Sequence, residues 1–356
     1  MNRINALKYF AILTAPAIGY ISLTYNGIWA WALVIYVYGI IPAIELVSPT
    51  SEVNMTVAEE EVAKQDKFYD WLLYMIVPIH FCLLFYYLFV ITQGGLSFLD
   101  IVGKTAAMGI ANTTFGINVG HELGHRAKKS ERIMAKLLLL STSYMHFFIE
   151  HNRGHHKNVS TDEDPASSRL NEPLYSFWIR SVRDGYKSAW ELENGRLDRN
   201  NIAILSWDNE MIRFTVIQIA FSLFIWMVFG FTGMLYFWMA SIIGFLLLET
   251  VNYIEHYGLR REKTDRGTYS KVEPIHSWNS NHAIGRIMLF ELTRHSDHHY
   301  KASRKYQVLR HFDESPQMPF GYPAMMLLAF IPPVFFSLMN KQIEKYKAQH
   351  PDAALA

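Results

Sequence analysis

Cysteine is almost absent from this chain of 356 residues, which contains Cys82 alone. A single thiol excludes a disulfide framework and any cysteine-ligated zinc or iron–sulfur site within the chain. Charge of one sign is lacking as well: the net charge is +1, and no basic low-complexity arm indicates nucleic-acid binding. No short apolar segment with a small-residue cleavage site opens the chain, so we expect its first apolar run to be retained.

Histidine, with 15 copies, is the abundant metal-binding residue. Fifteen histidines against one cysteine mean that any metal would be bound by nitrogen, with oxygen as a supplement.

Hydrophobic residues make up 51% of the chain and gather in runs long enough to cross a bilayer. The turns between paired runs, at residues 25–27 and 93–95 and near Gly230, carry no lysine or arginine, whereas the long polar segments carry many. By the positive-inside rule, we expect both termini and both long polar segments in the cytoplasm. The expected spans are residues 7–24, 28–47, 71–91, 96–119, 212–229 and 231–253.

Nine histidines fall in four clusters that this topology places at one face of the membrane. His151 and His155 are four residues apart and would lie on one side of a helix, while the 3.6-residue period turns His156 about 100° away. One metal would then use the pair, and a second metal would use His156. Residues 295, 298 and 299 would share one face of another helix. The predicted ligands are His121, His125, His151, His155, His156, His256, His295, His298 and His299.

Nine nitrogens exceed one tetrahedral zinc site and suit two five- or six-coordinate ions with open positions. Imidazole binds iron, copper, nickel and zinc alike, so the ligand type does not identify the metal. A metal pair at the ends of apolar helices has a lipid-like substrate within reach, and a pair of redox-active irons can oxidise an unactivated C–H bond, which hydrolytic zinc cannot.

Two other classes of protein are compatible with part of this pattern. Residues 121–125 read H-E-x-x-H, the motif of zinc proteases with Glu122 as general base, but the histidines of 151–156 and 295–299 would then have no role. A metal transporter would need ligands along a path through the bilayer, whereas these end helices at one face.

Carboxylates beside the clusters are expected to accept the distal N–H of a ligand imidazole and so to fix its tautomer. The acidic residues 162–164 are expected in a solvated loop instead. The predicted outer-shell groups are Glu122, Glu150, Glu255 and Asp297, with His276 and His282 as further candidates.

We therefore predict an all-α integral membrane protein with about six transmembrane helices and a helical cytoplasmic domain that carries a histidine-rich dimetal site. Residues 1–119 would form transmembrane helices 1–4, and residues 211–254 helices 5 and 6. The segments 120–210 and 255–356 would bring the histidines together on the cytoplasmic side, and the whole chain would act as one functional unit.

Four segments together resemble the integral-membrane alkane 1-monooxygenases, or alkane ω-hydroxylases, of the membrane fatty acid desaturase and hydroxylase superfamily. These segments are H-E-L-G-H-R at 121–126, E-H-N-R-G-H-H at 150–156, N-Y-I-E-H-Y-G at 252–258 and L-T-R-H-S-D-H-H at 292–299. Fatty acyl desaturases share three such histidine segments, so 252–258 is the more specific marker.

The resemblance implies a non-haem enzyme with two iron ions in the bacterial inner (cytoplasmic) membrane. It would hydroxylate the terminal methyl of medium-chain n-alkanes to 1-alkanols, with O2 and electrons from a rubredoxin that an NADH-dependent reductase reduces. The chain has neither a cysteine cluster nor a glycine-rich dinucleotide fingerprint, which agrees with an external electron donor. A related desaturase, or a hydroxylase of alkylbenzenes or fatty-acid ω-ends, is the alternative.

This implied chemistry indicates two further sets of residues. Rubredoxins tend to be acidic, so the candidates for docking are Arg126, Lys128, Lys129, Arg132, Lys136, Arg153 and Lys157. The alkane would enter from the bilayer past bulky residues of the second span, namely Trp29, Trp31, Tyr36 and Tyr38.

Overall fold

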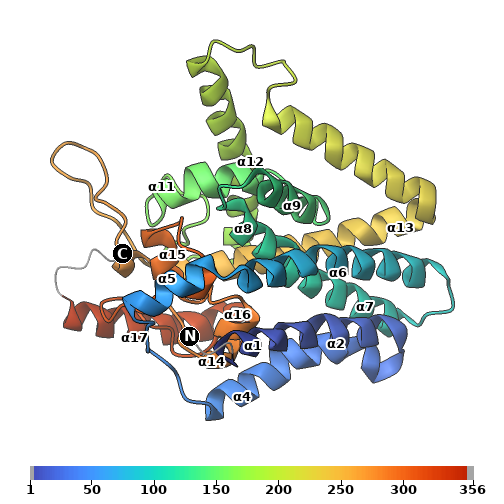
Figure 1. The fold of residues 1–356 in the computed structure, drawn as a ribbon, viewed down its shortest axis with the longest axis horizontal. Coiled ribbons are helices and arrows are strands. Elements are labelled where there is room, and N and C mark those ends of the chain that lie inside the picture. The colour runs from blue at the N-terminus through green and yellow to red at the C-terminus, as the bar shows by residue number, and fades with distance from the viewer. Residues whose placement is uncertain (1–3, 351–356) are drawn as a thin grey trace.

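Helices dominate the fold. The computed structural model describes residues 4–350, and β pairing in that range is confined to three isolated bridges. Figure 1 shows long helices that run side by side as a bundle, with shorter helices gathered towards one end of it.

The first half of the chain supplies four helical segments of the bundle, at the positions expected from the hydrophobic runs. The second segment is continuous from Gly27 to Val47, and the third is the single helix α6. The first, second and fourth segments each comprise several shorter helical elements, and η3 in the second and η4 in the fourth are π-helical. The elements are α1 (Ile4–Leu7), η1 (Lys8–Leu13), α2 (Thr14–Thr24), η2 (Gly27–Trp31), α3 (Ala32–Ile35), η3 (Tyr36–Ile40), α4 (Ile41–Val47), α6 (Lys67–Thr92), α7 (Phe98–Ala111), η4 (Asn112–Ile117) and α8 (Asn118–Gly124).

Helix α13 (Glu210–His256) supplies the last two arms of the bundle, and Figure 1 shows it folding back on itself. The break lies at Gly230, where φ is 72° and ψ is 176°, a conformation that glycine alone adopts readily. Three segments are long and apolar enough to cross a membrane: Gly27–Val47, Lys67–Thr92 and Glu210–His256. The full count of six spans stays a prediction.

Two charged residues of α7 hold the first turn of the bundle. Lys104 is fully buried, and its Nζ donates to the carbonyl oxygens of Leu23 and Tyr25 at 2.8 Å, where α2 ends. Asp100 accepts a hydrogen bond from the backbone N–H of Gly27 at 2.6 Å. The last carbonyls of a helix lack partners within it, so the lysine closes the end of α2.

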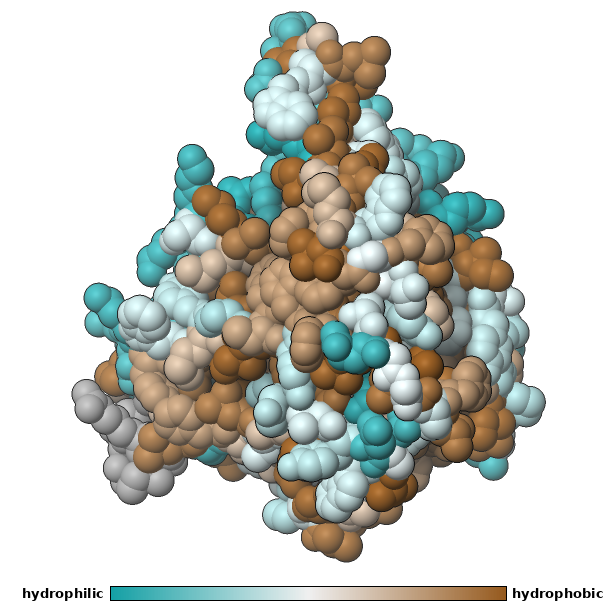
Figure 2. Space-filling model, turned by 90° about the vertical axis from the view of Figure 1, so that its right-hand side faces the viewer, coloured by the Kyte–Doolittle hydropathy of each residue, from teal (hydrophilic) through white to brown (hydrophobic). Residues whose placement is uncertain are grey.

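The end of the bundle where the hairpins turn exposes apolar side chains. Figure 2 views the molecule from this side and shows extensive brown surface. Large apolar residues exposed near the turns are Ile28, Trp29, Phe98, Leu99, Met227 and Phe231. An apolar end whose turns lack lysine and arginine suits a lipid environment.

Shorter helices cover the other end of the bundle and place the histidines. α12 packs along both α10 and α13, and α16 also packs on α13. The remaining elements are α5 (Val57–Gln65), α9 (Lys129–Leu140), α10 (Phe147–Glu150), η5 (His151–His155), α11 (His156–Asn158), α12 (Leu174–Arg199), η6 (Pro274–His276), α14 (Ala283–Met288), α15 (His295–Tyr300), η7 (Tyr306–Val308), α16 (Tyr322–Ala329) and α17 (Pro332–Gln349).

Candidate metal centre

Four helical segments meet at the end of the bundle opposite the hairpin turns. They bring the nine predicted histidines into two groups. Two of the segments are the C-terminal ends of α8 and α13. The others are the continuous turn formed by η5 and α11, and the short helix α15. Residues far apart in the chain therefore converge because the long helices end at the same level.

The first group contains five imidazoles. Their Nε2 atoms form an unbroken series of contacts, from His298 to His121 at 2.9 Å, to His125 at 3.1 Å, to His151 at 3.2 Å and to His156 at 3.0 Å. The five ligand atoms lie within 4.8 Å of one another, which is compact enough to surround one ion.

The second group contains four imidazoles, all of them buried. Nε2 of His295 lies 2.9 Å from Nε2 of His299 and 3.3 Å from Nε2 of His256. His155 completes the group, and the four ligand atoms again lie within 4.8 Å of one another.

In both groups the Nε2 atoms of the imidazoles face one another, and this arrangement fits a bound metal ion. A neutral imidazole has one N–H and one lone pair, so it cannot donate from Nε2 to two neighbours at once. Nε2 of His121 nevertheless meets both His298 and His125, which leaves lone pairs opposed unless a cation lies between them. The donor set of both groups therefore fits a metal that imidazole binds.

The charge state of these rings agrees with that role. Burial first, and then the neighbouring histidines, hold the pKa values of His151, His156, His295, His298 and His299 well below the usual 6.5. The rings are therefore neutral at pH 7, and a neutral imidazole is the form that ligates a metal.

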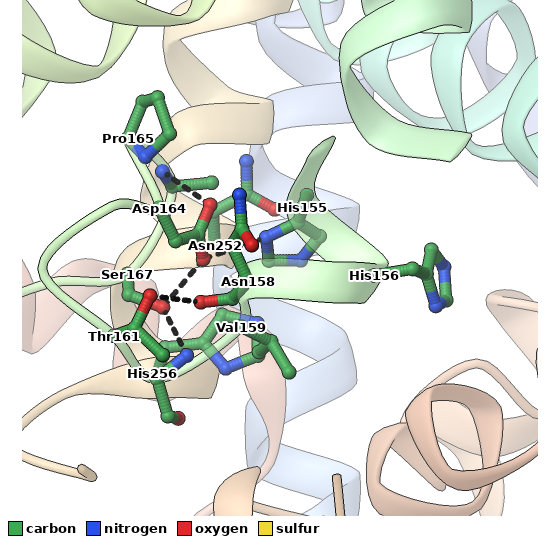
Figure 3. Close-up of polar contacts among 12 residues, drawn as sticks. His155, His156, Asn158, Val159, Thr161, Asp164, Pro165, Ser167, Asn252 and His256 are labelled. Carbon is green, nitrogen blue, oxygen red and sulfur yellow. Dashed lines mark hydrogen bonds and ion pairs between the residues drawn. The ribbon is translucent and has the colours of Figure 1, made fainter. Parts of the chain in front are cut away.

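The histidines of residues 151–156 divide between two groups, but not in the expected pairing. His151 groups with His156, and His155 joins the second group. The reason is that η5 is a π-helix, in which hydrogen bonds join residues five apart. That wider turn places the side chains of His151 and His156, five residues apart, on the same side of the helix. Figure 3 shows His156 pointing away from His155.

The histidines of α15 are likewise divided. His295 and His299, four residues apart, share the second group, whereas His298 belongs to the first. The expected single face therefore spans both groups, since His298 and His299 differ by about 100° around the helix.

A functional contact that sequence reasoning missed lies at Asp164, which was expected in a solvated loop. Asp164 is 1% exposed, and its carboxylate accepts a hydrogen bond from Nδ1 of His155 at 2.9 Å and another from the hydroxyl of Ser167 (Figure 3). Burial disfavours charge on His155, but Asp164 outweighs it and raises the pKa of this histidine. With Nδ1 occupied, Nε2 is the atom that faces the second group.

The aspartate's loop neighbours Asp162 and Glu163 are exposed, as predicted. In the structure, Asp164 accepts a hydrogen bond from the backbone N–H of Ala166, which forms an Asx turn. The sequence signal for this contact is an aspartate of the kind that forms such turns. It indicates a turn but not its burial.

Two of the predicted outer-shell carboxylates pair with arginines where histidines were expected. Glu122 accepts two hydrogen bonds from Arg126, and Asp297 accepts two from Arg304. Both carboxylates are buried, so these pairs fix the helices that carry the ligands.

The other predicted outer-shell groups lie in varied places. Glu150 is buried beside the second group, and burial followed by the charge of Asp164 raises its pKa. Nδ1 of His276 accepts from the backbone of Glu273, and Nδ1 of His282 lies 3.0 Å from the hydroxyl of Ser280.

Glu255 does approach a predicted ligand. Its Oε2 lies 3.2 Å from Nε2 of His295, which is the ligand side of that ring and not the distal side.

The predicted docking residues divide into exposed and internal ones. Arg126 is buried in ion pairs with Glu122 and Asp70, and Arg153 pairs with Glu193 and Glu210, so neither is free for a partner. Lys136 likewise pairs with Glu210. The exposed members are Lys128, Lys129, Arg132 and Lys157.

Two narrow apolar cavities lead from the histidines into the bundle. His121, His151 and His295 line the inner one, and Tyr38 lines the outer one. Residues that line both are Thr113, Thr114, Val251, Leu289 and Tyr322. The two cavities are thus adjacent, one beside the histidines and the other deeper in the bundle.

Of the four predicted channel residues, Tyr38 alone lines these cavities. Trp29 is 57% exposed, the indole of Trp31 packs at Gly103, and the hydroxyl of Tyr36 contacts Thr14 on the surface. Because η3 is π-helical, neighbouring side chains of this segment leave the helix in directions that a regular period does not give.

Comparison with known proteins agrees with this site. A sequence model of the fatty acid desaturase family matches residues 98–329. The chain is 38% identical to "Alkane 1-monooxygenase 1" of Alcanivorax borkumensis, over 93% of this chain and 82% of that protein. It is 37% identical to "Alkane 1-monooxygenase" of Pseudomonas putida, over 96% of this chain and 86% of that protein.

A more distant relative is the xylene/toluene monooxygenase hydroxylase component of Pseudomonas putida, 26% identical over 95% of this chain and 88% of that protein. The alkane 1-monooxygenases match at markedly higher identity over a similar length. The chain is therefore an oxidoreductase that belongs to the alkane 1-monooxygenase family, within the fatty acid desaturase family.

Proposed function

We propose that this protein hydroxylates the terminal methyl of medium-chain n-alkanes. The balanced reaction is alkane + O2 + two electrons + two protons → 1-alkanol + water. The observation that carries the proposal is the position of both histidine groups at the inner end of an apolar cavity.

The nine histidines would hold two iron ions, five in the first group and four in the second. When bound, iron supplies the activation of O2 that an unactivated C–H bond requires. The chain's own contribution is to favour the neutral form of the other buried imidazoles, to orient His155 through Asp164, and to keep water away with apolar walls.

A linear hydrocarbon suits the cavities because their walls are mainly apolar. We propose that the alkane enters from the bilayer, passes Tyr38 in the outer cavity, and reaches the histidines between Val251 and Leu289. The methyl end would then lie between His121 and His295. A wide aromatic ring fits such a narrow path less well, which favours alkanes over alkylbenzenes.

Electrons would come from a rubredoxin. His125 and His156 are the two ligands that are only half-buried, whereas the second group is wholly buried. The exposed Lys128 and Lys129 lie three and four residues after His125, and Lys157 directly follows His156. An acidic donor attracted by these lysines would approach the first group.

The proposed location is the bacterial cytoplasmic membrane, with both termini and the metal centre on the cytoplasmic side. The three segments of spanning length and the lysine-free turns at the opposite end support this placement.

An assay with purified protein tests the proposal. Reduced rubredoxin, its NADH-dependent reductase, 18O2 and alkanes from pentane to hexadecane should give 1-alkanols that carry one labelled oxygen, and His121→Ala should give none. No alkanol from any alkane, with product from xylene or a fatty acyl substrate instead, would support the related oxygenases. One zinc and no iron per chain would support a zinc protease.

A further inference from the structure

Glu255 occupies an unusual position for a carboxylate beside a histidine site. It lies in the last turn of α13, one residue before His256, and is 1% exposed. Its Oε1 accepts a hydrogen bond from the hydroxyl of Tyr322 at 2.8 Å, and its Oε2 lies 3.2 Å from Nε2 of His295. One oxygen is therefore held by the protein while the other faces the histidines.

The side of the ring that Glu255 approaches distinguishes a ligand from an orienting group. A carboxylate that orients a ligand histidine contacts the nitrogen away from the metal, as Asp164 does at Nδ1 of His155. Glu255 instead approaches Nε2 of His295, the same atom that His256 and His299 approach through their own Nε2 atoms. Three donor atoms therefore approach Nε2 of His295, and one of them is the carboxylate oxygen of Glu255.

Glu255 also faces a cavity that histidines of both groups line. It lines the inner cavity together with His121 and His151 of the first group and His295 of the second. The second group has four imidazoles whose ligand atoms lie within 4.8 Å of one another, and Glu255 adjoins that set through its 3.2 Å contact with His295. Combined histidine and carboxylate ligation is a common arrangement for non-haem iron.

We propose that Glu255 is a metal ligand of the second group, with Tyr322 positioning its carboxylate through the hydrogen bond to Oε1. The inference rests on the proposed metal centre. It assigns the second ion four nitrogen donors and one anionic oxygen donor, whereas the first ion has nitrogen donors alone. The two ions are therefore chemically different, and the one with the carboxylate is favoured in the more oxidised state.

The test measures metal content and the iron spectrum, so that it does not depend on catalysis. Wild-type protein, Glu255→Ala, Glu255→Gln and Tyr322→Phe are loaded with 57Fe, exposed to a chelator, and examined by metal analysis and Mössbauer spectroscopy. Glu249→Gln is the matched control, because Glu249 is also a buried carboxylate of α13 but accepts from Tyr144 and Ser181.

We expect two distinct Mössbauer doublets from the wild type and from Glu249→Gln. Glu255→Ala should lose one iron at least about tenfold faster than the wild type and keep the other. In Glu255→Gln and Tyr322→Phe one doublet should shift while the other stays unchanged.

If the Glu255 variants keep two irons and both doublets of the wild type, Glu255 is not a ligand. Should Glu255→Ala fail to fold, the spectrum of Glu255→Gln decides the question. Wild-type protein that binds no iron would refute the proposed metal centre itself, a result distinct from failure of the Glu255 assignment.

Discussion

Asp164 accepts the Nδ1 proton of His155 at 2.9 Å, inside a region from which solvent is almost fully excluded. This contact selects the tautomer in which Nε2 of His155 presents its lone pair to the second histidine group. Asp164 would thus support the proposed metal site without contacting the metal itself.

Replacing Asp164 with asparagine should therefore weaken retention of the second iron by about 10- to 100-fold, because the amide fixes the ring less firmly. Iron per chain after dialysis against a chelator measures this effect. Asp162→Asn is the control in the same loop, since Asp162 is 71% exposed and pairs with Arg260 on the surface. Equal iron retention in both variants would mean that the tautomer of His155 is fixed by other means.

The grouping of the ligands predicts which histidines share an ion. Double replacement of His151 and His156 by alanine should remove one iron and spare the other, whereas double replacement of His155 and His156 should remove both. Metal analysis distinguishes the two cases. The control is His146→Ala, which is buried but outside both groups and should keep two irons. Loss of a single iron from the 155/156 variant would contradict the π-helical register.

Bulk at the junction of the two cavities should block the substrate but not the metals. Val251 lines both cavities, so Val251→Trp should reduce alkanol formation at least about tenfold while iron content stays at the wild-type value. Gas chromatography of the alkanol measures the effect. The control is Val228→Trp. Val228 lies on the same helix but is 55% exposed, so this replacement should leave the rate of alkanol formation unchanged. An undiminished rate in Val251→Trp would place the alkane path elsewhere.

The exposed lysines should govern association with the electron donor. Lys128→Glu with Lys129→Glu should raise the KM for reduced rubredoxin several-fold and weaken its dependence on ionic strength, while kcat stays the same. Lys187→Glu is the control, because Lys187 is an exposed lysine of α12 that pairs only with the exposed Glu191. A KM that does not change would exclude this face as the docking surface.

A buried ion-pair cluster should stabilise the turn that carries His151. Burial would raise the pKa of Glu193, but hydrogen bonds from Arg196, the backbone of Glu210 and Arg153 outweigh it and lower the pKa to about 2. The pKa of Glu193 is therefore lower in the folded than in the unfolded chain. Its ionised carboxylate stabilises the fold above about pH 4.5, and this stabilisation is lost as the pH falls towards 2.

Glu193→Gln should therefore lower the free energy of unfolding by about 1–3 kcal/mol at pH 7. Thermal unfolding in detergent measures the loss, which should shrink between pH 5 and pH 3. A difference that stays constant over this range would assign it to packing instead of charge.

The sequence predicts the bundle well, because hydrophobic runs of spanning length and lysine-free turns are local signals. Gly230 shows this clearly, since a glycine between two apolar runs marks a turn that the structure confirms. The nine histidines are also predictable as a set, because each cluster has ligand spacing and the topology brings their helix ends to one level.

The register of the ligands was not predictable, because the regular helical period assigns His151 and His155 to one side and a π-helix changes that assignment. Nor were the partners of the carboxylates. Glu122 and Asp164 are both acidic residues near histidines, yet the first pairs with Arg126 and the second with His155. That choice depends on tertiary contacts, which local spacing does not encode.

At two places, adjacent residues of the chain belong to different histidine groups: His155 and His156, and His298 and His299. Each pair is joined by one peptide unit of fixed length, and the two pairs belong to separate helices. The covalent backbone therefore limits how far the two histidine groups can move apart, and ions bound in them would keep that spacing as their charge changes. Any change in that spacing during turnover would require both helices to bend. The backbone therefore fixes the distance at which the two histidine groups would hold their ions.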